Sequence, residues 1–401
     1  MTTTAERMRA WTGPAILTFG FRPFFLGAAL WAALAMVLWL AMLAGRLDLP
    51  AAFDPVSWHA HEFLFGYLGA VMAGFLFTAV PNWTGRLPIV GWPLAGVFAL
   101  WLAGRLAVTL PLGLPPLAVA LADLAFPLVF ALLIAIEIVA GRNWRNLVVL
   151  GLLSVFALGN AVFHVEAASG GFPAQGAGTR IGLGAAILLI GVIGGRIVPS
   201  FTRNWLVQRG PGRLPVPPMQ DFDKLALAVL AAALLCWIAA PQGTLAGIAL
   251  ALTGVLHLIR LARWAGDRTA AEPLVLVLHL GYAFLPLGAL VMALEILLPD
   301  LLTGAGGQHL WMAGGIGLMT MAVMTRASLG HTGQPLTANR GTRLIYGALL
   351  VAILSRLAAA LLPGQADLLL KLAGLAWIAG FGGFGLVYGP QLLRHRKDRK
   401  G

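Results

Sequence analysis

Histidines beside apolar stretches are the residues of this chain best suited to chemistry. Two of them lie in the string Trp58-His59-Ala60-His61-Glu62, and His309 and His331 lie at the two ends of another apolar stretch. Imidazole is costly to bury in hydrocarbon without a partner, and it is a common ligand of haem iron and of copper. The pattern therefore predicts that these side chains bind a haem or a metal ion within a membrane.

The composition predicts an integral membrane protein. Of the 401 residues, 59% are hydrophobic and 10% are charged, whereas a soluble protein carries about 25% charged residues. Twelve stretches reach the roughly 20 apolar residues that a helix needs to cross a bilayer. We expect an all-α fold with spans at 24–45, 58–80, 89–110, 115–140, 146–167, 180–199, 224–240, 243–265, 272–297, 308–328, 342–362 and 366–390.

Basic residues alternate between the loops and indicate an orientation. Of the 27 Lys and Arg residues, 22 fall on the side that holds both termini. The positive-inside rule then places both termini in the cytoplasm, where the basic tail 393–401 can contact anionic lipid. The net charge of +12 is a topology signal and does not predict nucleic-acid binding, because no concentrated basic face exists.

Three similar polar strings at the ends of spans predict an internal triplication. They are Pro81-Asn82-Trp83-Thr84, Pro199-Ser200-Phe201-Thr202 and Leu329-Gly330-His331-Thr332. Aligning them superposes Gly66, Gly184 and Gly314, and it superposes His61, Thr179 and His309. We therefore expect a single membrane domain, 1–401, built from three four-helix units around a pseudo-threefold axis. The repeat units cover about 22–145, 146–268 and 269–392.

Threefold repetition would bring the histidines of the second and tenth spans to one depth. His61 and His309 could then face each other and ligate a haem, which would be b-type because no CxxCH string is present for covalent attachment. The alternative is that both are interfacial histidines hydrogen-bonded to loops. The arrangement is similar to the topology of the haem–copper oxidase main subunit, in which such a pair holds a low-spin haem. The likeness ends at the sixth span, where Thr179 replaces a copper-binding histidine.

Further candidates surround this pair. His59 is two residues before His61 and points about 200° away on a helix, so it would serve a second metal together with His164 or be a solvated residue. Glu62 is either an acceptor that orients an imidazole or an exposed acid at a helix start.

Four more polar residues are candidates for cofactor or metal binding: His279, His331, Arg326 and Arg22. His279 would be a metal ligand or part of a proton relay. His331, close to Arg326, would hold a haem propionate or a metal, or order its loop. Arg22 would hold a cofactor carboxylate or anchor its helix at the interface.

A set of strings across the chain resembles the NnrS family. They are Arg22-Pro23-Phe24-Phe25, Trp58-His59-Ala60-His61-Glu62, Pro81-Asn82-Trp83-Thr84-Gly85, Gly195-Arg196-Ile197-Val198-Pro199-Ser200-Phe201-Thr202 and Arg326-Ala327-Ser328-Leu329-Gly330-His331-Thr332-Gly333. The resemblance implies a bacterial inner-membrane protein that contains haem and copper and is linked to nitric oxide metabolism and nitrosative stress. His59, His61, His309 and His331 fall within these motifs, and His279 falls in a less distinctive segment.

Three functions are compatible with these patterns. The first is a haem- and copper-binding protein of nitric oxide metabolism, with nitric oxide as its small ligand and an unidentified electron donor. Such a protein could be an oxidoreductase. The second function is a sensor that binds nitric oxide without turnover. The third, the alternative to both, is a twelve-span transporter, which predicts buried charges at the midplane and two six-helix halves.

Overall fold

The regular structure of this chain is helical. The computed structural model describes residues 11–49, 51–85, 88–299 and 306–395, and these residues contain no strand. Eleven helices within them are long and apolar enough to cross a membrane. The expected all-α fold is therefore confirmed, and the long apolar helices are consistent with an integral membrane protein.

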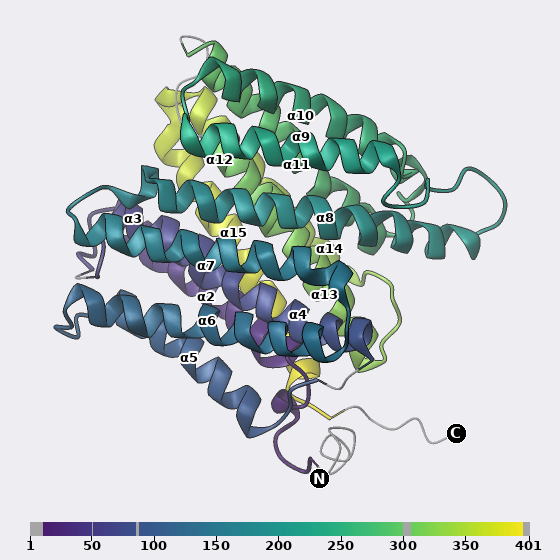
Figure 1. Cartoon of the computed structure of the whole chain (residues 1–401), viewed down its shortest axis with the longest axis horizontal. Helices are drawn as coiled ribbons and strands as arrows, with labels where there is room; N and C mark the ends of the chain where they lie inside the picture. The colour runs from purple at the N-terminus through teal and green to yellow at the C-terminus, as the bar shows by residue number, and fades with distance from the viewer. Residues whose placement is uncertain (1–10, 50, 86–87, 300–305, 396–401) are drawn as a thin grey trace. The chain divides into compact units, whose positions relative to one another are not determined.

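The helices follow the expected spans closely (Figure 1). The N-terminal helices are α2 (Phe21–Leu43), α3 (Pro55–His61), α4 (Leu68–Thr84), α5 (Trp92–Thr109), α6 (Pro116–Ala140), α7 (Leu147–Ala168) and α8 (Ala177–Val207). The later ones are α9 (Asp221–Ala239), α10 (Thr244–Ala262), α11 (Pro273–Leu297), α12 (Gly306–His309), α13 (Met319–Thr332), α14 (Arg340–Leu361) and α15 (Ala366–Leu392). Short 3-10 turns lie at Ala15–Leu17, Trp144–Asn146, Pro173–Gln175, Gly266–Arg268 and Pro363–Gln365.

Two π-helical segments interrupt the α-helical pattern. The segment η2 (Glu62–Tyr67) joins α3 to α4, and η6 (Leu310–Leu318) joins α12 to α13. Each begins at the residue after a predicted ligand, His61 and His309 respectively. His61 and His309 superpose in the repeat alignment, and the segments that follow them share this uncommon geometry, which is often found at functional sites. The run from α12 to α13 coincides with the expected span 308–328, although it is not among the eleven apolar helices.

Local sequence explains where α3 and α4 begin and end. Asp54 caps α3, because its Oδ1 accepts hydrogen bonds of 3.0 Å from the backbone N–H groups of Val56 and Ser57. Pro55 at the first helical position has no N–H to leave unpaired. Gly85 follows α4 with a φ of 71°, a left-handed conformation that glycine adopts without strain. The cap and the proline thus fix the start of α3, shortly before His59 and His61.

The chain divides into two compact units, with boundaries inside α8, α13 and α15. Unit 1 contains residues 1–182, 324–335 and 381–401, and unit 2 contains residues 183–323 and 336–380. In unit 1, α2 packs against α4, α5 against α6, and α6 against α7. In unit 2, α10 packs against α9 and α11, and η6 packs against α11 and α14. The triplication stays a prediction.

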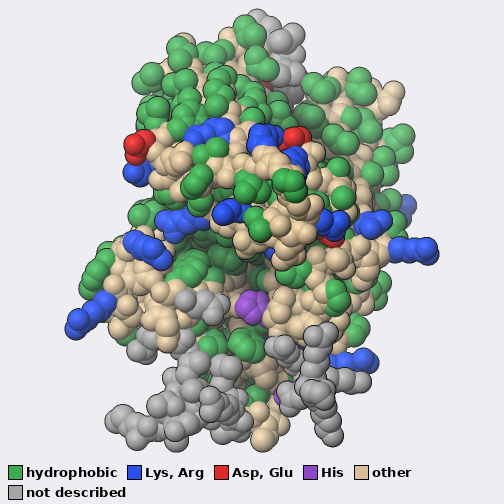
Figure 2. Space-filling view, turned by 90° about the vertical axis from the view of Figure 1, so that its right-hand side faces the viewer, with side chains coloured by type: hydrophobic (Ala, Val, Ile, Leu, Met, Phe, Trp, Pro, Cys, Tyr) green, Lys and Arg blue, Asp and Glu red, His purple; other side chains and the backbone are tan. Residues whose placement is uncertain are grey.

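Hydrophobic side chains form much of the surface, as a bilayer requires. Figure 2 shows one face, on which Lys and Arg side chains gather between large apolar areas. Many leucines are exposed, among them Leu121, Leu235 and Leu344 at 62%, 68% and 74%. In a lipid environment this exposure is favourable and needs no partner protein.

Candidate functional site

His61 is the centre of a buried polar cluster in unit 1. Its side chain is fully buried at the end of α3, and its Nδ1 lies 3.0 Å from Oε1 of Glu62. Trp31 on α2 donates a hydrogen bond of 2.7 Å to the other oxygen of Glu62. Glu62 is therefore the acceptor that orients the imidazole, and the alternative of an exposed helix-start acid is wrong.

Asp123 on α6 connects His61 to α7. Its Oδ2 lies 3.1 Å from Nε2 of His61 and 3.0 Å from Nε2 of His164, and it accepts a 2.8 Å hydrogen bond from Nδ2 of Asn160. Asn160 and His164 are four residues apart on α7, so they share one face of that helix. The spacing on α7 thus presents an amide and an imidazole to the same carboxylate.

Arg105 on α5 neutralises part of this acidic charge. Its guanidinium forms ion pairs with Glu62 through Nη1 and with Asp123 through Nη2. The Arg105–Asp123 ion pair joins the neighbouring helices α5 and α6. All three side chains are at most 3% exposed. Removing one member of such a buried set leaves an uncompensated charge, so the set depends on all of its members.

Two glycines give the ion pairs their space. A Cβ at Gly66 in η2 would lie 2.3 Å from Nη1 of Arg105, and one at Gly104 would lie 2.9 Å from Oδ1 of Asp123. Trp101 on α5 donates a 2.9 Å hydrogen bond to the carbonyl of Gly66. The π-helical segment therefore lets α5 approach closely, and the indole satisfies one of its carbonyl groups.

The cluster has the composition of a metal site. One ligand atom from each of His61, Asp123 and His164 lies within 4.8 Å of the others, and all three residues are buried. Nε2 of His61 also lies 2.9 Å from Oδ1 of Asn160, so both nitrogens of this ring face oxygen acceptors. One neutral imidazole has only one N–H to donate. A positive charge at Nε2, carried by a proton or by a metal ion, would satisfy the remaining acceptors.

Comparison with known proteins agrees with the motifs. A model of the family described as NnrS protein matches residues 15–396. The chain belongs to the NnrS family. Family membership and the apolar helices together indicate a multi-pass membrane protein related to nitric oxide. A search of curated proteins found no match.

The histidines of the NnrS motifs have different surroundings. His164, expected beside His59, lies instead beside His61, with ring centroids 5.4 Å apart. His59 stacks on Trp39 at 4.4 Å and also contacts Phe63. The expected divergence of His59 from His61 is consistent with these contacts.

His309 belongs to unit 2 and has a cationic neighbour there. Its Nδ1 lies 3.2 Å from Nη2 of Arg356 on α14, and its side chain is half-buried. His61 belongs to unit 1, so the two predicted haem ligands lie in different units of the structure. The pairing of His61 with His309 stays a prediction.

The remaining predicted site residues have structural contacts. Arg22 is buried, and its Nη1 donates hydrogen bonds of 2.8 and 2.7 Å to the carbonyls of Leu392 and Arg394 at the end of α15. His331 lies beside Phe21, with ring centroids 5.3 Å apart, and burial lowers the pKa of His331. Arg326 is half-buried on α13.

Unit 2 contains a second buried polar group. Arg260 on α10 forms a 2.8 Å ion pair with Asp223 on α9 and donates a 2.8 Å hydrogen bond to the hydroxyl of Tyr282. The same hydroxyl lies 2.8 Å from Nδ1 of His257. His279 is separate from this group, and its Nε2 lies 2.8 Å from the hydroxyl of Thr202.

Sequence patterns missed Asn160. Asn160 lies in an apolar run with no motif around it. Its one signal is the spacing of four residues to His164, which places both side chains on one helical face. A buried amide four residues from a buried histidine could therefore have indicated a shared site.

Proposed function

We propose that this NnrS-family chain is an inner-membrane protein of bacteria that binds copper and b-type haem. Its activity would lie in nitric oxide metabolism or in tolerance of nitrosative stress. The family match supports the link to nitric oxide. The His61–Asp123–His164 cluster is the structural observation that carries the metal part of the proposal.

The residues of the cluster fit a copper ion. Two imidazoles and a carboxylate are suitable ligands for copper, and also for zinc and iron. His61 and His164 would supply Nε2 atoms, and Asp123 would supply Oδ2. Glu62 would fix the ring of His61 through Nδ1, as histidine ligands usually require. When bound, copper would supply a binding site for nitric oxide and a one-electron redox change.

The surroundings of His61 fit a metal ion better than a haem. An axial haem ligand needs one ring nitrogen directed at the iron, with the flat macrocycle beside it. Nε2 of His61 is instead directed at Asp123 and Asn160, and the ring centroids of Phe53 and Phe163 lie 5.0 and 5.1 Å from the imidazole. The bis-histidine haem is therefore the competing assignment for His61.

Metal analysis and absorption spectra of the purified chain test both assignments. We expect copper to be lost in His61→Ala and His164→Ala but retained in His395→Ala, whose histidine is exposed in the tail. Reduced-minus-oxidised bands of b-type haem would establish haem. Loss of these bands in both His61→Ala and His309→Ala, with copper retained, would support the bis-histidine haem and contradict the metal cluster. Wild-type protein without metal or haem, despite adequate supply of both, would overturn the proposal.

Nitric oxide turnover separates an enzyme from a sensor. Consumption of nitric oxide by the purified protein with an artificial electron donor would identify an oxidoreductase. Stoichiometric binding without consumption would identify a sensor or a binding protein.

The transporter alternative receives less support. It predicts buried charges near the midplane. Arg105 lies near the end of α5 and Asp123 in the first third of α6. Asp223 lies at the start of α9, and its partner Arg260 lies near the end of α10. These buried ion pairs join helices near their ends, where they would pack neighbouring spans together.

A further inference from the structure

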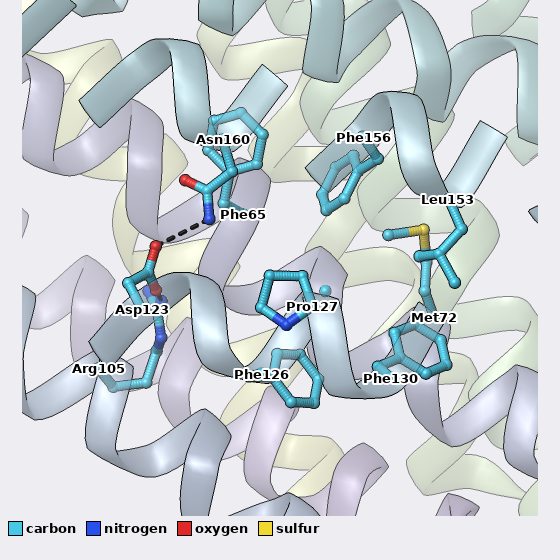
Figure 3. A pocket seen from close by; sticks show the side chains of 11 residues that line it. Phe65, Met72, Arg105, Asp123, Phe126, Pro127, Phe130, Leu153, Phe156 and Asn160 are labelled. Carbon is cyan, nitrogen blue, oxygen red and sulfur yellow. Dashed lines mark hydrogen bonds and ion pairs between the residues drawn. The ribbon is translucent and has the colours of Figure 1, made fainter. Parts of the chain in front are cut away.

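A small cavity adjoins the His61–Asp123–His164 cluster in unit 1 (Figure 3). It is lined by η2, α4, α5, α6 and α7, and it shares Asp123, Asn160 and Arg105 with the cluster. The centre of a water-sized molecule can occupy a volume of about 10 Å³ within it. That is space for about one small molecule.

The cavity has one polar end and is otherwise apolar. Its apolar side chains include Met72, Phe126, Phe130, Leu153 and Phe156. At the polar end, Asn160 donates its hydrogen bond to Asp123, and Arg105 is paired with Glu62 and Asp123. A stable buried water needs two to four polar partners, whereas apolar cavities stay dry and take up apolar guests. The lining therefore favours an apolar or weakly polar guest over water.

A proline inside a helix and a glycine without a side chain help to leave this space. Pro127 lies inside α6, where it removes one helical hydrogen bond. Gly69 on α4 lines the cavity without a side chain. A Cβ there would lie 3.6 Å from Cε1 of Phe126 and 4.0 Å from Cε1 of Phe156, which are ordinary contact distances. A methyl group at residue 69 would thus occupy part of the cavity without a clash.

We propose that this cavity binds one small uncharged diatomic molecule next to the His61–Asp123–His164 cluster. Nitric oxide fits this class, and the identification of the guest rests on the proposed function. The apolar side chains would hold the molecule out of water, and among the described lining residues its polar neighbours would be the cluster residues Asp123 and Asn160 and their partner Arg105. A molecule in the cavity would therefore lie directly beside the residues that would hold the metal.

Xenon tests the cavity without involving the metal. Crystals of the whole chain under xenon pressure should show an anomalous peak between Phe126, Leu153 and Phe156. Gly69→Ala should remove this peak. The control is Gly151→Ala on α7, because that glycine is exposed and a Cβ there meets no atom within 4 Å. A wild-type crystal without xenon at this position would overturn the proposal.

The rate of nitric oxide binding tests the connection to the cluster. In Gly69→Ala with its copper content unchanged, the association rate after flash photolysis should fall about tenfold, as expected when one methyl group obstructs a close-fitting site. Gly151→Ala should bind at the wild-type rate. Equal rates in both variants, with xenon excluded from Gly69→Ala, would contradict delivery through the cavity and leave the proposed function standing. Wild-type protein that holds copper but binds no nitric oxide would overturn the proposed function, while the xenon result would still decide the cavity.

Discussion

Single residues of the cluster orient their neighbours as well as bonding to them. Asp123 meets two imidazoles, an amide and a guanidinium through its two oxygens. Each partner fixes the carboxylate in one orientation, and a fixed carboxylate in turn orients the rings of His61 and His164. Contacts of this kind around metal ligands typically change metal affinity or activity about 10- to 100-fold when they are removed.

Replacing Asn160 by leucine should weaken the proposed metal site while keeping the volume of the side chain about the same. Asp123 would lose a 2.8 Å hydrogen bond and His61 would lose an acceptor at 2.9 Å. We expect copper affinity to fall about 10- to 100-fold. Competition with a calibrated copper chelator measures the change, and Ser154→Ala, at an exposed position of the same helix, is the control. Unchanged affinity in Asn160→Leu would show that Asn160 does not support the site.

Gly66→Ala should destabilise the protein, because the new methyl group would collide with Nη1 of Arg105. Displacing Arg105 breaks a buried ion pair at a cost of about 3–5 kcal/mol, which exceeds the gain of about 1 kcal/mol from replacing a helical glycine. Gly69→Ala, one turn further along, brings no such clash and is the matched control. Thermal unfolding in detergent compares the two variants, and equal melting temperatures would contradict the steric argument.

At the scale of the elements, the start of α3 positions the cluster. Asp54 caps a helix of only seven residues that ends at His61. Loss of the cap should therefore affect the imidazole as well as the helix. The continuous helical run through η2 also links the position of His61 to that of α4.

Asp54→Ala tests this link between cap and ligand. The lost cap should cost about 1 kcal/mol of stability and also lower copper affinity. Asn339→Ala removes a comparable cap from α14 in unit 2, where the side chain accepts a 2.9 Å hydrogen bond from the backbone of Thr342. It should lower stability by a similar amount without changing copper affinity. If both variants lose copper equally, the effect comes from general destabilisation.

Length and hydropathy predicted the helices well, because crossing a bilayer demands long apolar runs that are easily read. The expected span 58–80 corresponds to the run from Pro55 to Thr84, including its π-helical part. The π-helical segments themselves were beyond sequence patterns, which assume a period of 3.6 residues. The meeting of His61 with His164 was also missed, because their positions on separate helices are set by tertiary packing.

At the scale of the whole molecule, the charge distribution predicts a single orientation. By the positive-inside rule, the excess of Lys and Arg on one side predicts that both termini lie in the cytoplasm. Green fluorescent protein fused after Gly401 should therefore fluoresce, and alkaline phosphatase at the same position should be inactive. The opposite pair of results would reverse the orientation and move the cluster end of α3 from the periplasmic to the cytoplasmic side.

The ion pairs of Arg105 determine how much positive charge the cluster can accept. Glu62 and Asp123 bring two negative charges against one positive charge of Arg105, and all three are buried. One further positive charge neutralises the set. A proton on His61 and a cuprous ion would supply it equally, so copper uptake should release a proton and weaken as pH falls. A cupric ion would leave one excess positive charge in a medium of low dielectric constant. Arg105 cancels one of the two carboxylate charges, so it should raise the reduction potential of bound copper relative to the same site without the arginine and favour the reduced state.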